Sequence, residues 1–271
     1  MKLIIIPPYK GANYSPTRGQ FKVRQVVDSM QKKGQLEGVE VDIDDGYPFP
    51  EEIDAVARNE EFVASIAVGV IKKVREYSEM GKHDAIITTC DLEAGFFASR
   101  LVSKLPVTST SHAAMHIASL IGNRFTLLVM TEPLTLVVRH FAQTCGLSDK
   151  LVSVRYAPYS STYISNLALK HDEGERLNVP EGKNLIDALT AQCVAAIKED
   201  RVDSIIFPSC SFSIFADEVR QRLDEMDYSE IPIICGLPAA VEMAKALVNM
   251  KLTQAPRAYP GDNLKAKPEF G

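Results

Sequence analysis

Two cysteines, Cys90 and Cys210, lie at matching places in two segments of the chain. The segments "AIITTCDLEAG" (85–95) and "SIIFPSCSFS" (204–213) both run from an apolar stretch into a cysteine. Each apolar stretch belongs to an Asp-x-Ile-Ile pattern. Each cysteine is followed by a Phe-Ala pair, a proline-led apolar run and an Ala-Ala pair, in that order. The shared order predicts that the chain contains an internal repeat.

Such a repeat has a chemical use, because a pseudo-twofold axis would place Cys90 and Cys210 on opposite sides of a cleft. Inversion of a carbon that carries an acidic hydrogen needs a base on one face and an acid on the other, and the reverse reaction exchanges the roles. A free thiol has a pKa of about 8.5, which falls at a helix N-terminus. We expect a helix to begin just after each cysteine and to favour a thiolate, a substrate carboxylate or an enolate oxygen. The alternative is that both cysteines are small buried apolar residues.

The elements that must position these thiols follow from the alternation of short apolar runs and longer amphipathic segments. This alternation predicts an α/β fold with mostly parallel sheet, in which a site lies at the carboxyl ends of the strands. A proline-led strand is expected from Pro106, and the polar stretch 169–184 is the least structured. The other expected strands are 2–6, 39–43, 84–89, 124–131, 150–157, 202–208 and 231–236, and the expected helices are 17–34, 60–81, 92–105, 111–122, 134–146, 185–200, 214–226 and 238–250.

Composition narrows the classes of partner. The chain has 271 residues and a formal net charge of −5 without a Lys/Arg-rich run, so we expect no nucleic acid and no anionic membrane as partner. Its apolar runs are much shorter than the roughly 18 residues that a spanning helix needs. The N-terminal "MKLIIIPPYK" is expected to be a strand and not a signal peptide.

The five cysteines show neither a C-x-x-C motif nor zinc spacing, which indicates free thiols and a cytoplasmic protein. Cys145 and Cys193 lie within predicted helices, and Cys235 follows an apolar strand. We interpret these three as core residues.

From these motifs, the sequence resembles the aspartate/glutamate/hydantoin racemase superfamily, most closely its hydantoin racemase branch. The family pattern C-F-G-D-P-G-L corresponds to "CDLEAGF", in which Glu93 and Gly95 occupy the acidic and glycine positions. The segments "LPVTST", "HAAMHIASLIGNRF" and "TLLVMT" match the strand, helix and strand that follow. The first loop, "PPYKGANYS", and the second cysteine turn, "PSCSFS", depart from the family's NPN(T/S) and GC(T/S). These departures suggest an unusual substrate or reaction.

The resemblance implies two similar lobes of Rossmann-like or flavodoxin-like type, with the active site in the cleft between them. The first lobe would comprise residues 1–108 and 236–271 and carry Cys90, and the second would comprise 109–235 and carry Cys210. It also implies a cofactor-independent racemase or epimerase, which inverts the carbon next to a carbonyl in an amino-acid derivative such as a hydantoin or another cyclic amide. We expect a small-molecule substrate, no cofactor and a homo-oligomer of unspecified size.

The residues that flank the cysteines are candidates for substrate binding. Their N–H and hydroxyl groups would hold carboxylate or imide oxygens, although helix N-capping explains them equally well. These residues are Thr89, Asp91, Ser209 and Ser211. Phe212 follows Cys210 closely and stands where smaller residues are usual, so it is a further candidate.

The other candidates lie at predicted strand ends. Thr131 ends a strand and matches a family threonine. Pro8, Tyr9 and Asn13 lie in the first loop, where the fold predicts a wall of the site, although a plain turn is an alternative.

His112 begins a predicted helix and is a candidate for substrate contact, with a surface or capping role as the alternative. His112 and His116 form H-x-x-x-H without the acidic neighbour of a zinc protease motif, so we expect no metal.

Three other functions remain open. The same fold with a cysteine would also suit a cis–trans isomerase or a decarboxylase. A non-catalytic sensor of small molecules on a racemase scaffold is the third possibility.

Overall fold

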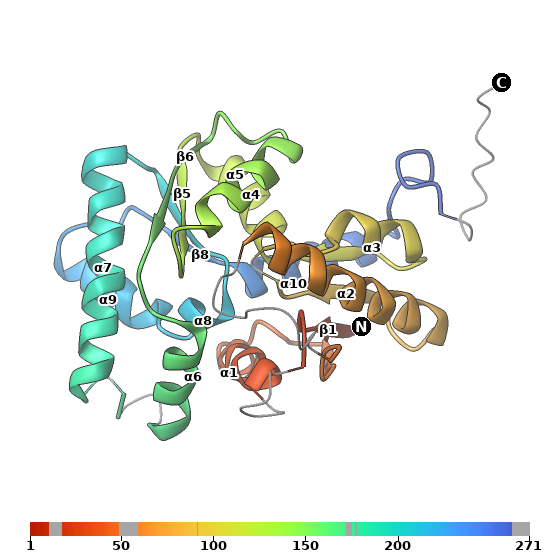
Figure 1. Ribbon diagram of the computed structural model, residues 1–271, viewed down its shortest axis with the longest axis horizontal. Helices are drawn as coiled ribbons and strands as arrows, with labels where there is room; N and C mark the ends of the chain where they lie inside the picture. Colours follow the sequence, from red (N-terminus) through yellow and green to blue (C-terminus); the bar gives the residue numbers. More distant parts are fainter. Residues whose placement is uncertain (11–17, 49–58, 91, 172–174, 177, 262–271) are drawn as a thin grey trace. The chain divides into compact units, whose positions relative to one another are not determined.

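A computed structural model describes residues 1–10, 18–48, 59–90, 92–171, 175–176, 178–261 of the chain (Figure 1). The chain divides into two compact units. The first takes the described residues within Met1–Ile53, Glu60–Ala113 and Leu237–Gly271, and the second those within Asp54–Asn59 and Ala114–Gly236. The division falls inside one helix, α4 (Thr110–Ile121), so this helix belongs to both units.

The first unit contains a parallel four-stranded sheet in the order β2-β1-β3-β4. Its strands are β1 (Lys2–Ile6), β2 (Glu40–Ile43), β3 (Ala85–Thr88) and β4 (Val107–Ser109). The middle strands are continuous apolar runs, and Leu3 to Ile6 are at most 1% exposed. A parallel strand of this kind is covered on both faces.

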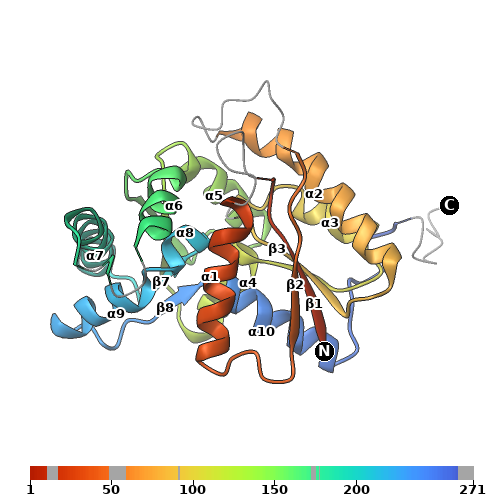
Figure 2. The same ribbon diagram turned by 90° about the horizontal axis from the view of Figure 1, so that it is seen from below.

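Helices cover both faces of this first sheet. Figure 2 shows α2 and α3 on one face and α1 and α10 on the other. Their bounds are α1 (Arg18–Lys32), α2 (Glu60–Met80), α3 (Phe96–Val102) and α10 (Gly236–Asn249). The hydroxyl of Thr108 on β4 donates to the carbonyl of Ala240, which joins α10 to the sheet.

The second unit repeats this plan with a parallel sheet in the order β6-β5-β7-β8. Its strands are β5 (Phe125–Val129), β6 (Leu151–Tyr156), β7 (Ser204–Phe207) and β8 (Ile233–Cys235). Figure 1 shows α7 and α9 on one face of this sheet, with α4 and α5 on the other. The remaining helices are α5 (Leu134–Thr144), α6 (Ser161–Lys170), α7 (Pro180–Asp200), α8 (Cys210–Ser213) and α9 (Ala216–Glu225).

The two sheets share their strand order, and the last pair of strands in each sheet has the same register. In the first unit, Thr88 at the end of β3 pairs with Ser109 at the end of β4. In the second, Phe207 at the end of β7 pairs with Cys235 at the end of β8. The structure therefore confirms the predicted α/β class with two similar parallel sheets, and it gives the sequence repeat a structural counterpart.

Outside the two cysteine loops, two parts of the chain differ from the sequence-based expectation. A helix, α6, occupies Ser161–Lys170, where none was predicted, and α7 begins at Pro180, before the expected residue 185. The hydroxyl of Ser160 caps α6 by accepting the N–H of Tyr163. Ile164, Leu167 and Ala168 are buried at helical spacing. The pattern was present in the sequence but short, and the polar stretch beside it obscured it.

In the described part of the chain, the helices are too short or too polar for any of them to cross a membrane.

Candidate functional site

Cys90 lies in the loop that leaves β3, and its side chain is 1% exposed. The N–H of Thr89 still donates to the carbonyl of Ile6, so sheet pairing with β1 continues to the residue before the cysteine. The N–H of Glu93 then donates to the carbonyl of Cys90 and closes a turn. Cys90 is thus held at the carboxyl edge of the sheet, where α/β proteins carry their sites.

The expectation that a helix begins directly after Cys90 is wrong. Helix α3 begins at Phe96, because Glu93 and Gly95 have φ values of +55° and +69° in the left-handed region. A right-handed helix cannot include such residues. At Gly95, moreover, a Cβ would lie 2.9 Å from the carbonyl oxygen of Ala67, so the turn needs glycine for space as well as for φ.

Glu93 is a residue that the sequence analysis did not select as a site residue, and the structure places it at the centre of this region. Its carboxylate is buried, and one oxygen, Oε1, accepts the N–H groups of Ser111 and His112 at 2.6 and 3.1 Å. Burial raises its pKa to about 7, while hydrogen bonds from Ser109, His112 and Ser111 oppose the rise. Its match to the acidic position of the family motif was the signal that pointed to it.

Buried hydroxyl groups gather at the carboxyl ends of β3 and β4. Thr88, Thr89 and Thr110 each have a buried hydroxyl oxygen with no hydrogen-bond partner among the residues that the structure describes. A buried polar group that lacks a protein partner requires another explanation, such as water or a ligand. Thr89 is the sequence candidate among these residues, and its predicted contact with substrate stays a prediction.

Cys210 begins α8, a helix of only four residues, and is 8% exposed. The hydroxyl of Ser209 caps this helix by accepting the N–H of Ser211 at 3.2 Å. Ser209 therefore performs the capping role that was its alternative interpretation. A helix follows this cysteine as expected, although so short a helix has few peptide dipoles to align.

The loop around Cys210 is closed by local bonds to its own backbone. The hydroxyl of Ser213 donates to the carbonyls of Ser209 and Phe207, at 3.0 and 3.3 Å. Phe212 is fully buried, with its ring 6.2 Å from that of Phe207 in an edge-on arrangement. The observed role of Phe212 is packing, and its predicted contact with substrate stays a prediction.

The other candidates are spread over both units. Thr131 lies just beyond β5, with a buried hydroxyl oxygen that has no hydrogen-bond partner among the described residues. Pro8 and Tyr9 follow β1 and line a hollow of about 200 Å³ in the first unit. Tyr47, Pro48, Ser65, Ile66, Val68 and Gly69 complete its lining. Asn13 and Asp91 lie outside the described residues.

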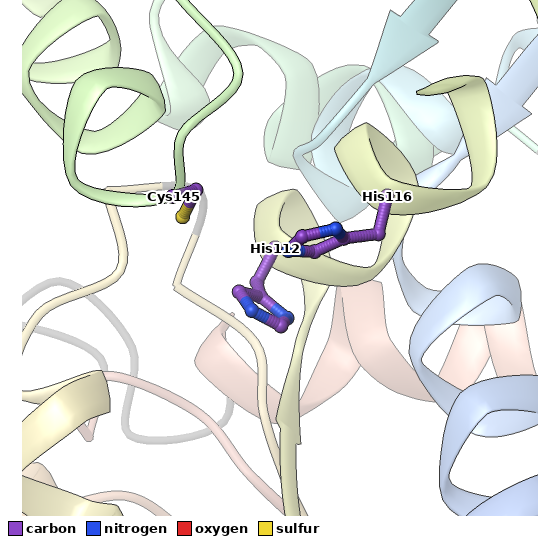
Figure 3. A group of neighbouring side chains, drawn as sticks. All are labelled: His112, His116 and Cys145. Atoms are coloured by element: carbon purple, nitrogen blue, oxygen red, sulfur yellow. The ribbon is translucent and has the colours of Figure 1, made fainter. Parts of the chain in front are cut away.

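His112 occupies the first turn of α4, with its ring 4.8 Å from that of Phe96. Figure 3 shows His112 and His116 on successive turns of this helix, together with Cys145, which caps the end of α5. The potential ligand atoms of these three side chains all lie within 4.8 Å of one another. Imidazole and thiolate ligands suit zinc or copper. The expectation of no metal stays a prediction.

Of the three cysteines interpreted as core residues, Cys193 is buried, whereas Cys145 and Cys235 are partly exposed and do not belong to the core. Cys193 is fully buried in α7, and burial raises the pKa of its thiol to about 12. Cys235 ends β8 and pairs with Phe207 in the sheet. A thiol with so high a pKa stays protonated near neutral pH, which makes Cys193 inert.

The sequence is similar to a known protein family and to curated proteins. The family model Asp/Glu/Hydantoin racemase matches residues 21–244. The curated hydantoin racemase of Pseudomonas sp. (strain NS671) is 22% identical over 192 residues, which are 70% of this chain and 69% of that protein.

Solved structures show the same fold. Allantoin racemase from Pseudomonas fluorescens aligns with a TM-score of 0.75 and 20% identity, over 98% of this chain and 99% of that one. Allantoin racemase from Klebsiella pneumoniae aligns with a TM-score of 0.71 and 21% identity, over 98% and 96% of the two chains. The family match covers most of the chain and includes both Cys90 and Cys210, so the chain belongs to the Asp/Glu/Hydantoin racemase family and is an enzyme of the isomerase class.

Proposed function

We propose that the protein is a cofactor-independent racemase or epimerase that uses Cys90 and Cys210 as a thiolate and thiol pair. One observation carries the proposal: each cysteine follows the third strand of a four-stranded parallel sheet, and the two sheets have the same strand order. Both side chains are at least nine-tenths buried, as a thiol that must exchange its proton only with substrate should be.

The chemistry requires the two thiols to face opposite sides of one carbon. The thiolate of one cysteine removes the proton from a carbon next to a carbonyl, and the electron pair moves onto the carbonyl oxygen. The thiol of the other cysteine then donates its proton to the opposite face. The two sulfurs have exchanged protonation states at the end, so the enzyme is poised for the reverse direction. As part of the same proposal, the active site would lie between a lobe of residues 1–108 with 236–271 and a lobe of residues 109–235.

The substrate that we propose is an amino-acid derivative such as a hydantoin or another cyclic amide. Hydantoin and allantoin racemases are among the relatives, and both names denote cyclic amides. The buried hydroxyls of Thr89 and Thr131 are available as donors to the ring's carbonyl oxygens. An activated carbon between a carbonyl and a nitrogen is acidic enough for a thiolate base.

The experiment is incubation of the purified protein in D₂O with a panel of single-enantiomer hydantoins, allantoin and free amino acids. NMR would follow deuterium at the α-carbon, and polarimetry would follow the loss of optical rotation. We expect both signals for at least one cyclic amide. The uncatalysed exchange of each compound, measured without protein, is the control. Binding without deuterium incorporation across the panel would favour the non-catalytic sensor.

The compartment and the assembly state are part of the same proposal. All five cysteines are free, which favours a reducing compartment such as the cytoplasm. We also expect a homo-oligomer, which light scattering coupled to size-exclusion chromatography would test.

A further inference from the structure

Glu93 connects the Cys90 loop to a neighbouring helix. Its backbone N–H donates to the carbonyl of Cys90 at 2.9 Å, and its own carbonyl accepts the N–H of Phe96 at 3.1 Å. Its side-chain oxygen Oε1 accepts the N–H groups of Ser111 and His112, 18 and 19 residues further along the chain. A single residue thus bonds to the turn that holds the thiol, to the start of α3 and to the first turn of α4.

The hydrogen bonds from the amides of Ser111 and His112 are strongest when the Glu93 carboxyl group is ionised. The first amides of a helix have no partner within the helix and carry the positive end of its dipole, so they attract a negative charge. Hydrogen bonds to an ionised acceptor are roughly twice as strong as neutral ones. A protonated Glu93 would still accept these N–H groups, but more weakly.

The charge state of Glu93 is sensitive to pH in the range where an enzyme works. Burial is the largest cause that raises its pKa, and the bonds from Ser109, His112 and Ser111 lower it, with a balance at about 7. A carboxyl group in water titrates near 4, so the fold itself has moved this group into the neutral range.

Other titratable groups near Glu93 are engaged with different partners. Arg100 on α3 lies over the ring of Phe96 and donates to the carbonyl of Val107 and the hydroxyl of Tyr259. The lysines Lys72 and Lys73 on α2 donate to Tyr47 and Asp44. His112 packs its ring against Phe96. The Cys90 loop also carries the titratable residues Cys90 and Asp91, and Asp91 lies outside the described residues.

We propose that Glu93 is a positioning residue, whose carboxylate fastens the Cys90 loop to the first turn of α4 and loosens it on protonation. This inference rests on the proposed role of Cys90. It makes the geometry of that thiol, and not only its ionisation, depend on pH. The amides of Ser111 and His112 are occupied by an internal carboxylate and therefore do not receive a substrate anion while Glu93 is charged.

The Cys210 loop supplies a matched control. Ser213 lies three residues after Cys210, as Glu93 lies three residues after Cys90. Its hydroxyl bonds to the carbonyls of Phe207 and Ser209. A serine hydroxyl does not titrate in the working range, so Ser213→Ala removes a comparable loop contact without removing a titration.

The first measurement is an NMR titration of the backbone amides of Ser111 and His112, from about pH 5 to about pH 9. In the wild-type protein, we expect both amide protons to move downfield with an apparent pKa near 7 as their acceptor becomes charged. Glu93→Gln should abolish this step, and Ser213→Ala should keep it. This measurement needs no enzymatic activity, so it judges the hydrogen-bonded connection even if the proposed function fails. A titration that persists in Glu93→Gln would overturn the assignment.

The second measurement is the pH profile of α-deuteration. Misplacing a reacting group by about an ångström can cost about a hundredfold in rate, so we expect Glu93→Gln to lower kcat by ten- to a hundredfold with a small change in KM. The variant should also lose the limb of the profile that titrates near 7, which Ser213→Ala should retain. Glu93→Asp keeps the charge and should recover part of kcat.

Two results would count against a positioning role. If Glu93→Gln raised KM alone, Glu93 would act in substrate binding. If it lowered kcat equally at every pH, its role would be independent of charge. Should Glu93→Gln fail to fold, the wild-type titration and the Glu93→Asp profile still decide the matter.

Discussion

The two cysteine loops occupy the same place in two equivalent sheets, yet they are built differently. The Cys90 loop contains two left-handed residues and connects to α4 through a buried carboxylate. The Cys210 loop turns directly into a four-residue helix, which is capped by Ser209 and closed by Ser213. The Cys90 loop is thus held in part by a carboxyl group that can titrate, whereas the hydroxyls of Ser209 and Ser213, which hold the Cys210 loop in part, do not titrate. If both cysteines act as proposed, two equivalent catalytic groups would be held in place by different local structures.

Removing each thiol separately tests whether both cysteine loops are required for the reaction. We expect Cys90→Ala and Cys210→Ala each to lower racemisation by about a thousandfold or more, because a base on one face cannot replace an acid on the other. Optical rotation of a single enantiomer is the measurement. Each variant should still exchange the α-hydrogen of one enantiomer with D₂O, since the remaining thiol can reach one face. Opposite enantiomers for the two variants would assign each cysteine to a face.

The outcome also separates the competing chemistries. In a decarboxylase, one of the two alanine variants would keep its activity, because only one proton is delivered. Serine variants serve as a closer match in size, and we expect them to be nearly as inactive, since a hydroxyl is a far weaker acid than a thiol.

The free energy of unfolding should depend on pH because ionisation of the buried Glu93 carboxyl group destabilises the folded state. Its pKa is raised from 4.5 to about 7 in the folded state, so the unfolded chain releases the proton first. The folded state therefore loses stability as pH rises from about 4.5 to about 7, by about 3 kcal/mol, and the loss remains at higher pH. Urea unfolding at several pH values, for the wild type and Glu93→Gln, is the measurement. Over this interval, the unfolding free energy of the wild type should fall relative to that of Glu93→Gln. Ser213→Ala should show the same pH dependence as the wild type.

Gly95 tests how far the Cys90 loop depends on close packing. Gly95→Ala places a Cβ 2.9 Å from the carbonyl oxygen of Ala67 at a φ of +69°. Gly81→Ala is the matched control, because Gly81 has a φ of +64° with nothing within 4 Å of the added atom. The control should lose about 1 kcal/mol from left-handed strain, and Gly95→Ala about 1 to 2 kcal/mol more from the close approach. Thermal unfolding measures both, and equal losses would show that the loop relaxes freely.

Much of this comparison was visible in the sequence, because it rests on periodicity and on repeated landmarks. The apolar runs that lead to Cys90 and Cys210 predicted two buried parallel strands. The structure shows β3 and β7 there, paired in the same register with β4 and β8. Local patterns sufficed since a strand buried on both faces is a continuous apolar run.

The turns and hydrogen bonds that hold the cysteine loops in place were not predictable in the same way. The segment after Cys90 has helical composition, but Glu93 adopts a left-handed conformation that local propensity disfavours. What compensates is a bond between Glu93 and the amides of Ser111 and His112, which are distant in sequence. Contacts of this kind arise only once β3 and β4 are paired, so no window of neighbouring residues contains them.

The smallest effect that we expect concerns metal removal, and it extends the comparison to the helices that follow the two sheets. Helix α4 carries His112 and His116, whereas α10 has Pro238 and Glu242 at the same offsets from the last strand. A thiol pair needs no metal, so dialysis against a chelator should leave the α-deuteration rate unchanged, and added zinc should not raise it. Atomic emission on the purified protein would show whether a metal is bound at all. A loss of activity on dialysis that zinc restores would contradict cofactor independence. It would direct attention to the imidazoles of α4 and the thiol of Cys145, because their ligand atoms are already within 4.8 Å of one another.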